Sequence, residues 1–210
     1  MKRTTTLALA VGILSVTSIA NAQSLKYTGT QLSSPNSGTI KANSNTSTVL
    51  MGALTFNTGS GSIVTYCADA NSPLNNSNNP YTVSNVDLTA GTGMSLAAKI
   101  LATSFSSATT ADQQAGLQLA IWDAIYDNGS SFSSGTGNFS VVSGVSSSVL
   151  GYASSYFTAG KNSNTTTAVE LFSAQGAGGQ SQLHVVPEPV SIATLGLGLA
   201  GLIRRRRNKK

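Results

Sequence analysis

The pattern of hydrophobic and polar residues predicts several β-strands at the two ends of the segment 23–186. Alternating or β-branched runs, which are typical of strands, occupy residues 25–32, 48–58, 62–68, 167–172 and 181–186. A Gly-rich segment, 174–180, separates the last two runs, so we expect them to form a hairpin. Polar stretches at 71–79 and 130–138 predict loops.

The middle of the chain has the spacing of helices instead. Apolar residues three and four positions apart predict helices at 94–105 and 111–126, and a third near 147–157. The order is therefore strands, then helices, then a hairpin. This order predicts an α+β fold: one β-rich, mainly antiparallel domain with a helical insertion, flanked by an N-terminal signal peptide and a C-terminal membrane-spanning sorting helix.

The segment 111–126 carries the clearest helical signals. Thr110 with Gln113 forms a capping-box pattern, which predicts that the helix begins here. At about 100° per residue, five apolar residues fall on one arc, whereas Leu119 and Asp123 point away from it. Gln118 and Trp122, one turn apart, lie at the edge of that arc, where we expect the core to meet water. The apolar arc consists of Leu117, Ala120, Ile121, Ala124 and Ile125.

Residues 1–22 have the pattern of a secretory signal peptide. A basic start is followed by an apolar stretch and then by Ala20-Asn21-Ala22, a small-x-small cleavage pattern. The alternative is an N-terminal membrane anchor, but the apolar stretch is short and interrupted by hydroxyl residues. We therefore expect an exported body that spans residues 23–186.

Three features follow one another at the C-terminus, in residues 187–210. Pro187-Glu188-Pro189 precedes an apolar helix at 190–203, and a basic tail at 204–210 contains Arg204, Arg205, Arg206 and Arg207. The helix would be about 21 Å long, shorter than the ~30 Å hydrocarbon core of a bilayer. The basic tail favours retention in the cytoplasm, which leaves the body outside.

This C-terminal arrangement resembles the PEP-CTERM sorting signal of Gram-negative bacteria. The resemblance implies that an exosortase-type membrane protease recognises Pro187, Glu188 and Pro189, removes the helix and delivers the protein to the cell surface or extracellular matrix. The prolines hold the chain extended, which suits a segment read by a protease. A plain single-span anchor is the alternative, and in either case the chain passes through an inner-membrane intermediate.

Composition and charge exclude several classes of function. The chain has a formal charge of +5, but its basic residues lie almost wholly at the two ends. Residues 23–186 hold four lysines against six acidic residues, a net charge of −2, so we expect no nucleic-acid partner. One cysteine and one histidine exclude an intramolecular disulfide and a Cys/His zinc site. We expect no metal and no cofactor.

The single cysteine, Cys67, follows a probable strand and has four interpretations. It is a buried core residue, it forms a disulfide between chains, it is the nucleophile of a hydrolase, or it forms an internal thioester with a glutamine. A hydrolase needs an imidazole base, and the only histidine, His184, lies in the expected last strand. A thioester needs a Cys and a Gln on separate rigid elements with an apolar shield, and Cys67, Gln118 and Trp122 provide these parts.

Two short motifs bear on this choice. Tyr66-Cys67-Ala68-Asp69 and Leu117-Gln118-Leu119-Ala120-Ile121-Trp122 together resemble the paired signatures of bacterial thioester domains, of the TQXA-like type. Leu117 stands where the commonest form has Thr. The resemblance covers roughly residues 25–186. It implies a surface adhesin in which Gln118 is the acyl group and Cys67 the leaving group, and which bonds once to an amine and is not an enzyme.

The remaining assignments extend this hypothesis. We expect Tyr66, Ala120 and Trp122 to shield the thioester, and Asp69 to orient nearby backbone or the incoming amine. The expected partners are the exosortase-type protease, the membrane before processing, and an amine-bearing surface protein or matrix polymer. The alternative is a non-reactive structural protein of the matrix or biofilm with a buried free cysteine.

Overall fold

The computed structural model describes residues 21–74, 77–129, 131–175 and 179–187. Six antiparallel strands close into a barrel in the order β1-β4-β5-β9-β8-β6, and three more form a separate sheet in the order β3-β2-β7. The barrel strands are β1 (Asn21–Thr30), β4 (Leu54–Asn57), β5 (Ser62–Cys67), β6 (Asn78–Asn85), β8 (Val169–Ala174) and β9 (Gln182–Val185). The sheet strands are β2 (Asn36–Ala42), β3 (Asn45–Met51) and β7 (Phe139–Ser143).

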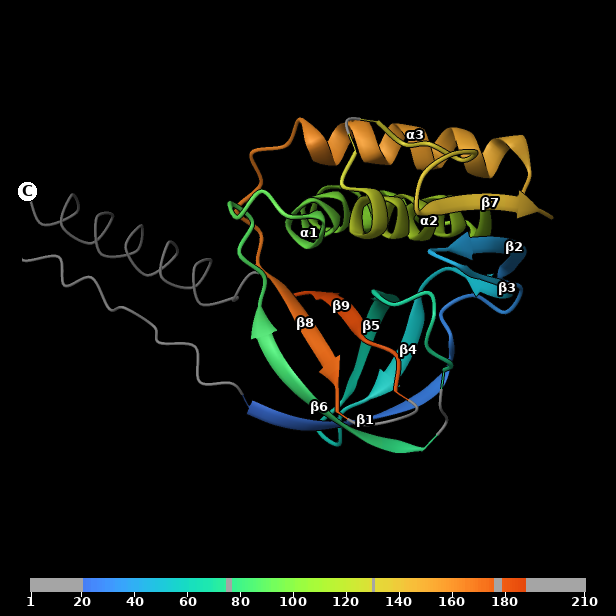
Figure 1. Ribbon diagram of the computed structural model, residues 1–210. Coiled ribbons are helices and arrows are strands. Elements are labelled where there is room, and N and C mark those ends of the chain that lie inside the picture. The colour runs from blue at the N-terminus through green and yellow to red at the C-terminus, as the bar shows by residue number, and fades with distance from the viewer. Residues whose placement is uncertain (1–20, 75–76, 130, 176–178, 188–210) are drawn as a thin grey trace, which may run out of the picture.

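Three helices form a layer at one end of the barrel, beside the three-stranded sheet (Figure 1). They are α1 (Gly93–Ser104), α2 (Ala111–Asp127) and α3 (Ser147–Lys161), with a short 3-10 turn, η1 (Phe105–Ser107), after α1. The fold is thus mixed, rich in antiparallel β-structure, with helices inserted between strands, as the sequence predicts at this level. The expected helices at 94–105, 111–126 and 147–157 are confirmed within a few residues.

Local capping explains where these helices begin. The Thr110 hydroxyl accepts a hydrogen bond from the Gln113 backbone, and the Gln113 side chain accepts one from the Thr110 backbone, which confirms the predicted capping box of α2. The helix ends at Asn128, whose φ of 47° is left-handed. Helices α1 and α3 begin at Thr92 and Ser146, whose hydroxyls accept from backbone N–H groups in the first turn.

The strand predictions were correct for four of the five runs. Residues 25–32 and 62–68 correspond to β1 and β5, and the predicted hairpin is β8 with β9, which pair antiparallel. The single strand expected at 48–58 is wrong. Gly52, with φ of 139°, ends β3 and lets the chain leave the sheet and enter the barrel as β4. The sequence analysis missed β2, β6 and β7.

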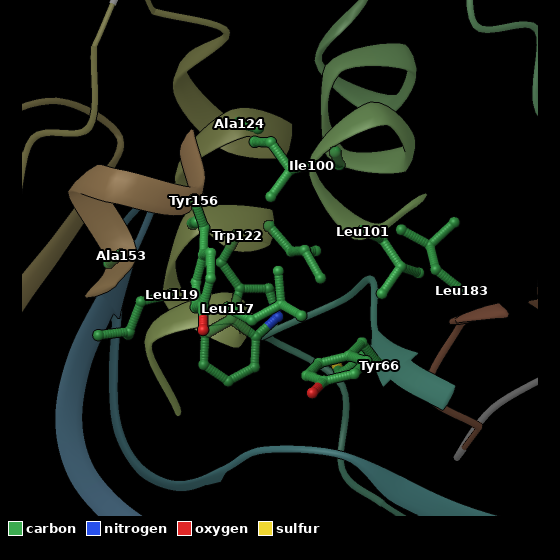
Figure 2. Close-up of a cluster of buried hydrophobic side chains, with 14 of the residues drawn as sticks. Tyr66, Ile100, Leu101, Leu117, Leu119, Trp122, Ala124, Ala153, Tyr156 and Leu183 are labelled. Carbon is green, nitrogen blue, oxygen red and sulfur yellow. The ribbon is translucent and has the colours of Figure 1, made fainter. Parts of the chain in front are cut away.

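The described residues form two separate hydrophobic cores. The barrel interior is filled by Leu25, Leu54, Phe56, Tyr81 and Phe172. A larger core lies between the helices, the three-stranded sheet and the outer side of β5 and β9. Trp122 and Tyr66 meet in this second core, among Leu117, Leu101 and Leu183 (Figure 2).

Helix α2 is buried on nearly every side, which corrects the expectation of one apolar arc. Leu119 is fully buried and Asp123 is 1% exposed, although both were expected to point away from the core. The reason is that α1, α3 and the three-stranded sheet all pack against α2, so its central part, residues 114–124, has no solvent face. Gln118 and Trp122 are likewise buried, and do not lie at the boundary with water.

Several predicted segments lie outside the described residues: most of the signal peptide (1–20), Glu188 and Pro189, the apolar helix 190–203 and the basic tail 204–210. Within the described ranges, none of the helices has the length and apolar character needed to cross a membrane.

Candidate functional site

The side-chain amide of Gln118 lies against the backbone of Cys67. The Cys67 N–H donates to Gln118 Oε1 at 3.0 Å, and Gln118 Nε2 donates to the Cys67 carbonyl at 2.8 Å. The amide thus pairs with the last residue of β5 as a neighbouring strand would. Both residues are almost fully buried. Helix α2 packs on β5, and this packing brings together two residues that are 51 positions apart.

The thiol of Cys67 is a free thiol that points into the turn after β5. Its Sγ donates to the Asp69 carbonyl at 3.0 Å and accepts from the Asp69 N–H at 3.2 Å. Burial raises the pKa of the Cys67 thiol strongly, and the hydrogen bond from the Asp69 backbone offsets only part of that rise. The sulfur is therefore held as the neutral thiol at neutral pH.

Trp122, one turn after Gln118 on α2, covers the same site. Its indole N–H favours the ionised form of the Cys67 thiol and so partly opposes the rise of the thiol pKa. It makes no hydrogen bond of ordinary length and angle, however, so Nε1 is a buried donor without a full partner. The indole ring packs against Phe139, with ring centroids 6.2 Å apart, which fixes its position in the core.

Asp69 organises the turn that follows Cys67. Its carboxylate accepts from the Asn71 N–H at 3.0 Å, from the Ser72 hydroxyl, and from the Tyr126 hydroxyl at 3.3 Å. The Tyr126 oxygen in turn accepts from the Ala70 N–H at 3.2 Å. Burial, and then the charge of Asp69, raise the pKa of Tyr126 to about 12, so it stays a neutral hydroxyl. Tyr126 and Gln118 thus both fasten α2 to the end of β5.

A partly open cavity of about 380 Å³ leads to this site. Cys67, Gln118 and Trp122 lie at its inner end. One wall is formed by β3 and the other by the segment 70–74 together with Gln180. The Gln118 amide therefore lines a hollow that is partly open to the surface, although the side chain itself is almost fully buried.

Gln180 holds the second wall in place. Its Nε2 donates to the carbonyls of Asp69 and Ser72, at 3.1 and 3.0 Å. The side chain of Gln182 donates to Gln180, and its own Oε1 accepts from the buried Thr65 hydroxyl at 2.9 Å. The turn that positions the Cys67 sulfur is therefore tied to both β5 and β9.

The structure brings together some of the predicted site residues and not others. Cys67, Gln118 and Trp122 line one cavity, and Asp69 orders the adjacent turn. Tyr66 and Ala120 lie in the core behind the site and not on the cavity wall. The ring of Tyr66 packs edge-on against Phe105 (Figure 2 shows Tyr66 beside Trp122).

The lone histidine does not pair with the cysteine. His184 Nδ1 lies 2.9 Å from the Val64 carbonyl, three residues before Cys67 on β5, and its ring packs on Phe172. The thiol has backbone atoms of Asp69 as its partners instead. The hydrolase interpretation therefore has no imidazole base in place.

Sequence reasoning missed three residues that hold the surroundings of the site: Tyr126, Gln180 and Gln114. Gln114, one turn before Gln118, accepts from the Ala53 N–H at 3.4 Å and so holds the crossover between β3 and β4. Gln114, Gln118, Trp122 and Tyr126 are spaced four residues apart on one helix face, which was the available signal. Gln180 gave no signal, because it is the last residue of the Gly-rich segment 174–180, which was expected to be only a hairpin loop.

Within the described part of the chain, no three His, Cys, Asp or Glu side chains cluster closely enough to hold a metal ion.

A comparison of the sequence with protein-family profiles gives no match, and a comparison with curated proteins gives none either. Among solved structures, the chain is similar to the N-terminal thioester domain of a surface protein from Clostridium perfringens. The two share 13% identical residues with a TM-score of 0.47, over 78% of this chain and 98% of that chain.

Proposed function

We propose that this chain is an exported surface or matrix protein in which Cys67 and Gln118 form an internal thioester that bonds once to an amine. The observation that carries the proposal is the pairing of the Gln118 amide with both backbone groups of Cys67 at the inner end of a cavity. Acyl transfer requires a thiol and a carboxamide that are held near each other. Cys67 supplies the thiol, and the buried Gln118 side chain supplies a carboxamide that is fixed against the Cys67 backbone.

Thioester formation is an exchange within this pair. The Cys67 Sγ forms a bond to Gln118 Cδ, the bond from Cδ to Nε2 breaks, and the thiol proton goes to the departing nitrogen, which leaves as ammonia. The Cys67 N–H already donates to Gln118 Oε1, the atom on which negative charge develops. A fixed donor at that position lowers the barrier because it needs no reorganisation during the reaction.

The second step uses the same groups in reverse. An incoming primary amine forms a bond to Gln118 Cδ, the bond from Cδ to Sγ breaks, and a proton from the amine returns to the sulfur. Loss of ammonia leaves the Cys67 carbonyl without its donor, so the amine can donate to that oxygen in place of Nε2. The product is an amide, the thiol is released, and the acyl group is consumed, so the protein is not a turnover enzyme.

Burial determines how long such a bond lasts. Trp122 and Leu54 contribute apolar surface to the cavity, and Gln118 is 1% exposed. Water reaches the acyl carbon only through the cavity, and hydrolysis is slow where water is scarce. An amine that enters the cavity is the stronger nucleophile and competes successfully.

Export and sorting complete the proposal. The signal pattern at 1–22 and the Pro187-Glu188-Pro189 pattern with its apolar segment and arginine cluster support delivery across the inner membrane of a Gram-negative cell and processing by an exosortase-type protease. The test is the mass of the protein recovered from the cell surface. Protein that has lost residues 190–210 supports processing, and surface protein that retains Arg204 to Lys210 contradicts it.

A second candidate is a non-reactive matrix protein with a reduced core cysteine. The hydrogen bonds between the Cys67 sulfur and the Asp69 backbone favour it, because they satisfy the thiol without any reaction. The strongly raised pKa of the thiol points the same way, since it disfavours the nucleophilic thiolate.

Intact mass spectrometry of the freshly purified protein separates the two candidates. A thioester lowers the mass by one ammonia relative to the chain with its experimentally mapped termini, and it blocks thiol reagents at Cys67. Cys67→Ala and Gln118→Ala should each restore the full mass. Gln118→Glu is the matched control, because it keeps the shape of the side chain without the amide. Full mass with a titratable thiol in the unmodified protein would remove the thioester proposal.

A further inference from the structure

Strand β3 is a free edge of the three-stranded sheet. Among the described residues, β2 is the one strand that pairs with it, in unbroken register from Asn45 to Met51. Ala42 and Asn45 flank a two-residue turn, so they form a hydrogen-bonded pair, and hydrogen-bonded and non-bonded pairs alternate from there. The backbone N–H and C=O groups of Thr46, Thr48 and Leu50 therefore point away from β2, along the edge.

This edge lacks the features that usually protect an exposed strand. Edge strands are commonly short, bulged, or marked by lysine or proline, which prevents another strand from pairing with them. β3 has seven residues, no bulge against β2, and neither a charge nor a proline. The opposite edge, β7, is shorter, carries an irregularity against β2, and its Val141 N–H donates to the Ser134 carbonyl.

The unprotected edge lies directly beside the candidate site. Ser47, Thr48, Val49 and Leu50 form one wall of the cavity that ends at Gln118, and Figure 1 shows β3 as the strand of its sheet nearest the barrel. The opposite wall belongs to segment 70–74, so the free edge and the cavity form one continuous surface. Of the described residues that line the cavity, none carries a formal charge.

We propose that an extended peptide segment of the target adds to β3 as a fourth strand and delivers a lysine side chain to Gln118. This inference rests on the proposed thioester. The lysine Nζ forms the bond to Gln118 Cδ, the Sγ–Cδ bond breaks, and the proton goes to Cys67. Backbone pairing aligns the peptide largely regardless of its sequence, while the side chain that enters the cavity supplies the selectivity.

The chemistry of the cavity fits a lysine carried on such a strand. A lysine has a four-carbon apolar stem, which can lie along Leu50 and Leu54 while the amine reaches the polar end of the cavity. Leu50 is 58% exposed, so a docked segment would cover an apolar side chain that water now surrounds. Because the walls carry no charge, they give no electrostatic selection among the residues that flank the lysine, and backbone pairing must hold the segment.

Adduct formation with two amine probes tests the proposal. One probe is a peptide with a central lysine between alternating threonine and valine residues, and the other is Nα-acetyl-lysine methylamide. We expect the peptide to react about tenfold faster or more than the small probe, because backbone pairing raises the local concentration of the amine. N-methylation of the alternate peptide amides that would pair with β3 should remove this advantage.

A matched pair of variants at one position isolates the backbone contribution. Thr48→Pro removes the backbone N–H that points away from β2, so the hydrogen bonds between β3 and β2 remain. Thr48→Ala keeps this N–H and changes only the side chain. We expect Thr48→Pro to bring the peptide down to the rate of the small probe, and Thr48→Ala to keep most of the advantage. The quantity compared is the ratio of the peptide rate to the small-probe rate within each variant, so that an effect of the substitution on the cavity itself cancels.

Other outcomes overturn the docking proposal. Equal rates for the two probes, or equal peptide rates in Thr48→Pro and Thr48→Ala, would exclude pairing at β3. A dimer in the unmodified protein that Thr48→Pro dissociates would assign the edge to a second copy of this chain instead.

Failure of the thioester itself is recognised separately, by full intact mass and no adduct with either probe. In that case the docking of the peptide is measured by a binding experiment that does not depend on thioester formation. Titration of the peptide into isotope-labelled Cys67→Ser protein should shift the amide resonances of Thr46, Thr48 and Leu50, and absence of these shifts would exclude docking.

Discussion

The Tyr126 hydroxyl donates to the Asp69 carboxylate at 3.3 Å and accepts from the Ala70 N–H at 3.2 Å, so that the end of helix α2 is tied to the turn after β5. Two turns earlier, Gln118 makes the other tie, to Cys67. The pair fixes both the acyl carbon and the turn that holds the sulfur. Rigid placement on two elements is what a reaction between distant residues requires.

Tyr126→Phe tests the importance of the second tie. It leaves the buried Ala70 N–H without its acceptor and removes one donor to Asp69, so we expect a loss of about 1–2 kcal/mol in the free energy of unfolding. Urea denaturation measures this loss. We also expect a smaller fraction of ammonia-deficient protein in the intact mass spectrum. Tyr152→Phe, at an exposed position on α3, is the control and should change neither quantity. An unchanged stability in Tyr126→Phe would show that the tie contributes nothing.

Gly116→Ala should disturb the contact between α2 and α3. A Cβ at Gly116 would lie 2.6 Å from the Cβ of Tyr152 and 2.9 Å from the Val149 carbonyl, so one helix must move. We expect a loss of about 1–3 kcal/mol, measured by thermal or urea denaturation. Gly151→Ala is the control within α3, because nothing lies within 4 Å of its added Cβ, and it should stabilise the protein by about 0.5–1 kcal/mol. Equal effects of the two substitutions would contradict close packing at Gly116.

Asp123 predicts a pH dependence of stability. Burial raises its pKa from 3.8 to about 6, and its Oδ2 has no hydrogen-bond partner. The folded state therefore binds a proton more tightly than the unfolded state, so this residue makes stability fall as pH rises from about 4 to about 6. Above that range the cost is constant, on the order of 1–3 kcal/mol.

Asp123→Asn removes the charge while its Oδ1 can still accept from the Ser133 N–H. We expect the variant to be more stable than the parent at pH 7 and to lack the decline between pH 4 and pH 6, as read from urea midpoints across that range. A parallel pH profile in parent and variant would show that Asp123 is not the responsible group.

Trp122→Phe separates packing from shielding. The smaller ring loses buried contact area, which destabilises the fold, but it also removes a buried N–H that has no full partner. We therefore expect the free energy of unfolding to fall by about 1–3 kcal/mol. The cavity wall beside Gln118 opens, and the thioester should then hydrolyse faster. The measurement is the time course over which the ammonia-deficient mass gains the mass of one water. A lifetime equal to that of the parent would assign the shielding to other residues.

Much of the fold was accessible from the sequence, because its signals are local. The capping box at Thr110 and Gln113 and the hairpin on either side of the Gly-rich loop depend on neighbouring residues only. The break at Gly52 was missed, since the apolar run 49–54 continues across it and only the switch of the chain from one sheet to the other reveals it. The burial of Leu119 and Asp123 was also missed, because periodicity cannot show how many elements surround a helix.

Some residues of the candidate site could likewise be predicted from local motifs, and others could not. Two motifs led us to expect Cys67 and Gln118 to lie together, and the structure places the Gln118 amide against the backbone of Cys67. Tyr66 and Ala120 were expected at the site on the same grounds but lie in the core behind it, since adjacent residues on a strand or helix face different directions. Tyr126 and Gln180 act through long-range hydrogen bonds, which no local pattern encodes.

The separation of Cys67 and Gln118 along the chain also controls timing. In the unfolded polypeptide, the thiol and the carboxamide meet rarely, and no stable pocket excludes solvent around them. In the proposed mechanism the thioester can therefore appear only after α2 has docked on β5, so that an unfolded chain in transit across a membrane would carry two inert side chains. Thioester formation would then indicate that the domain has finished folding.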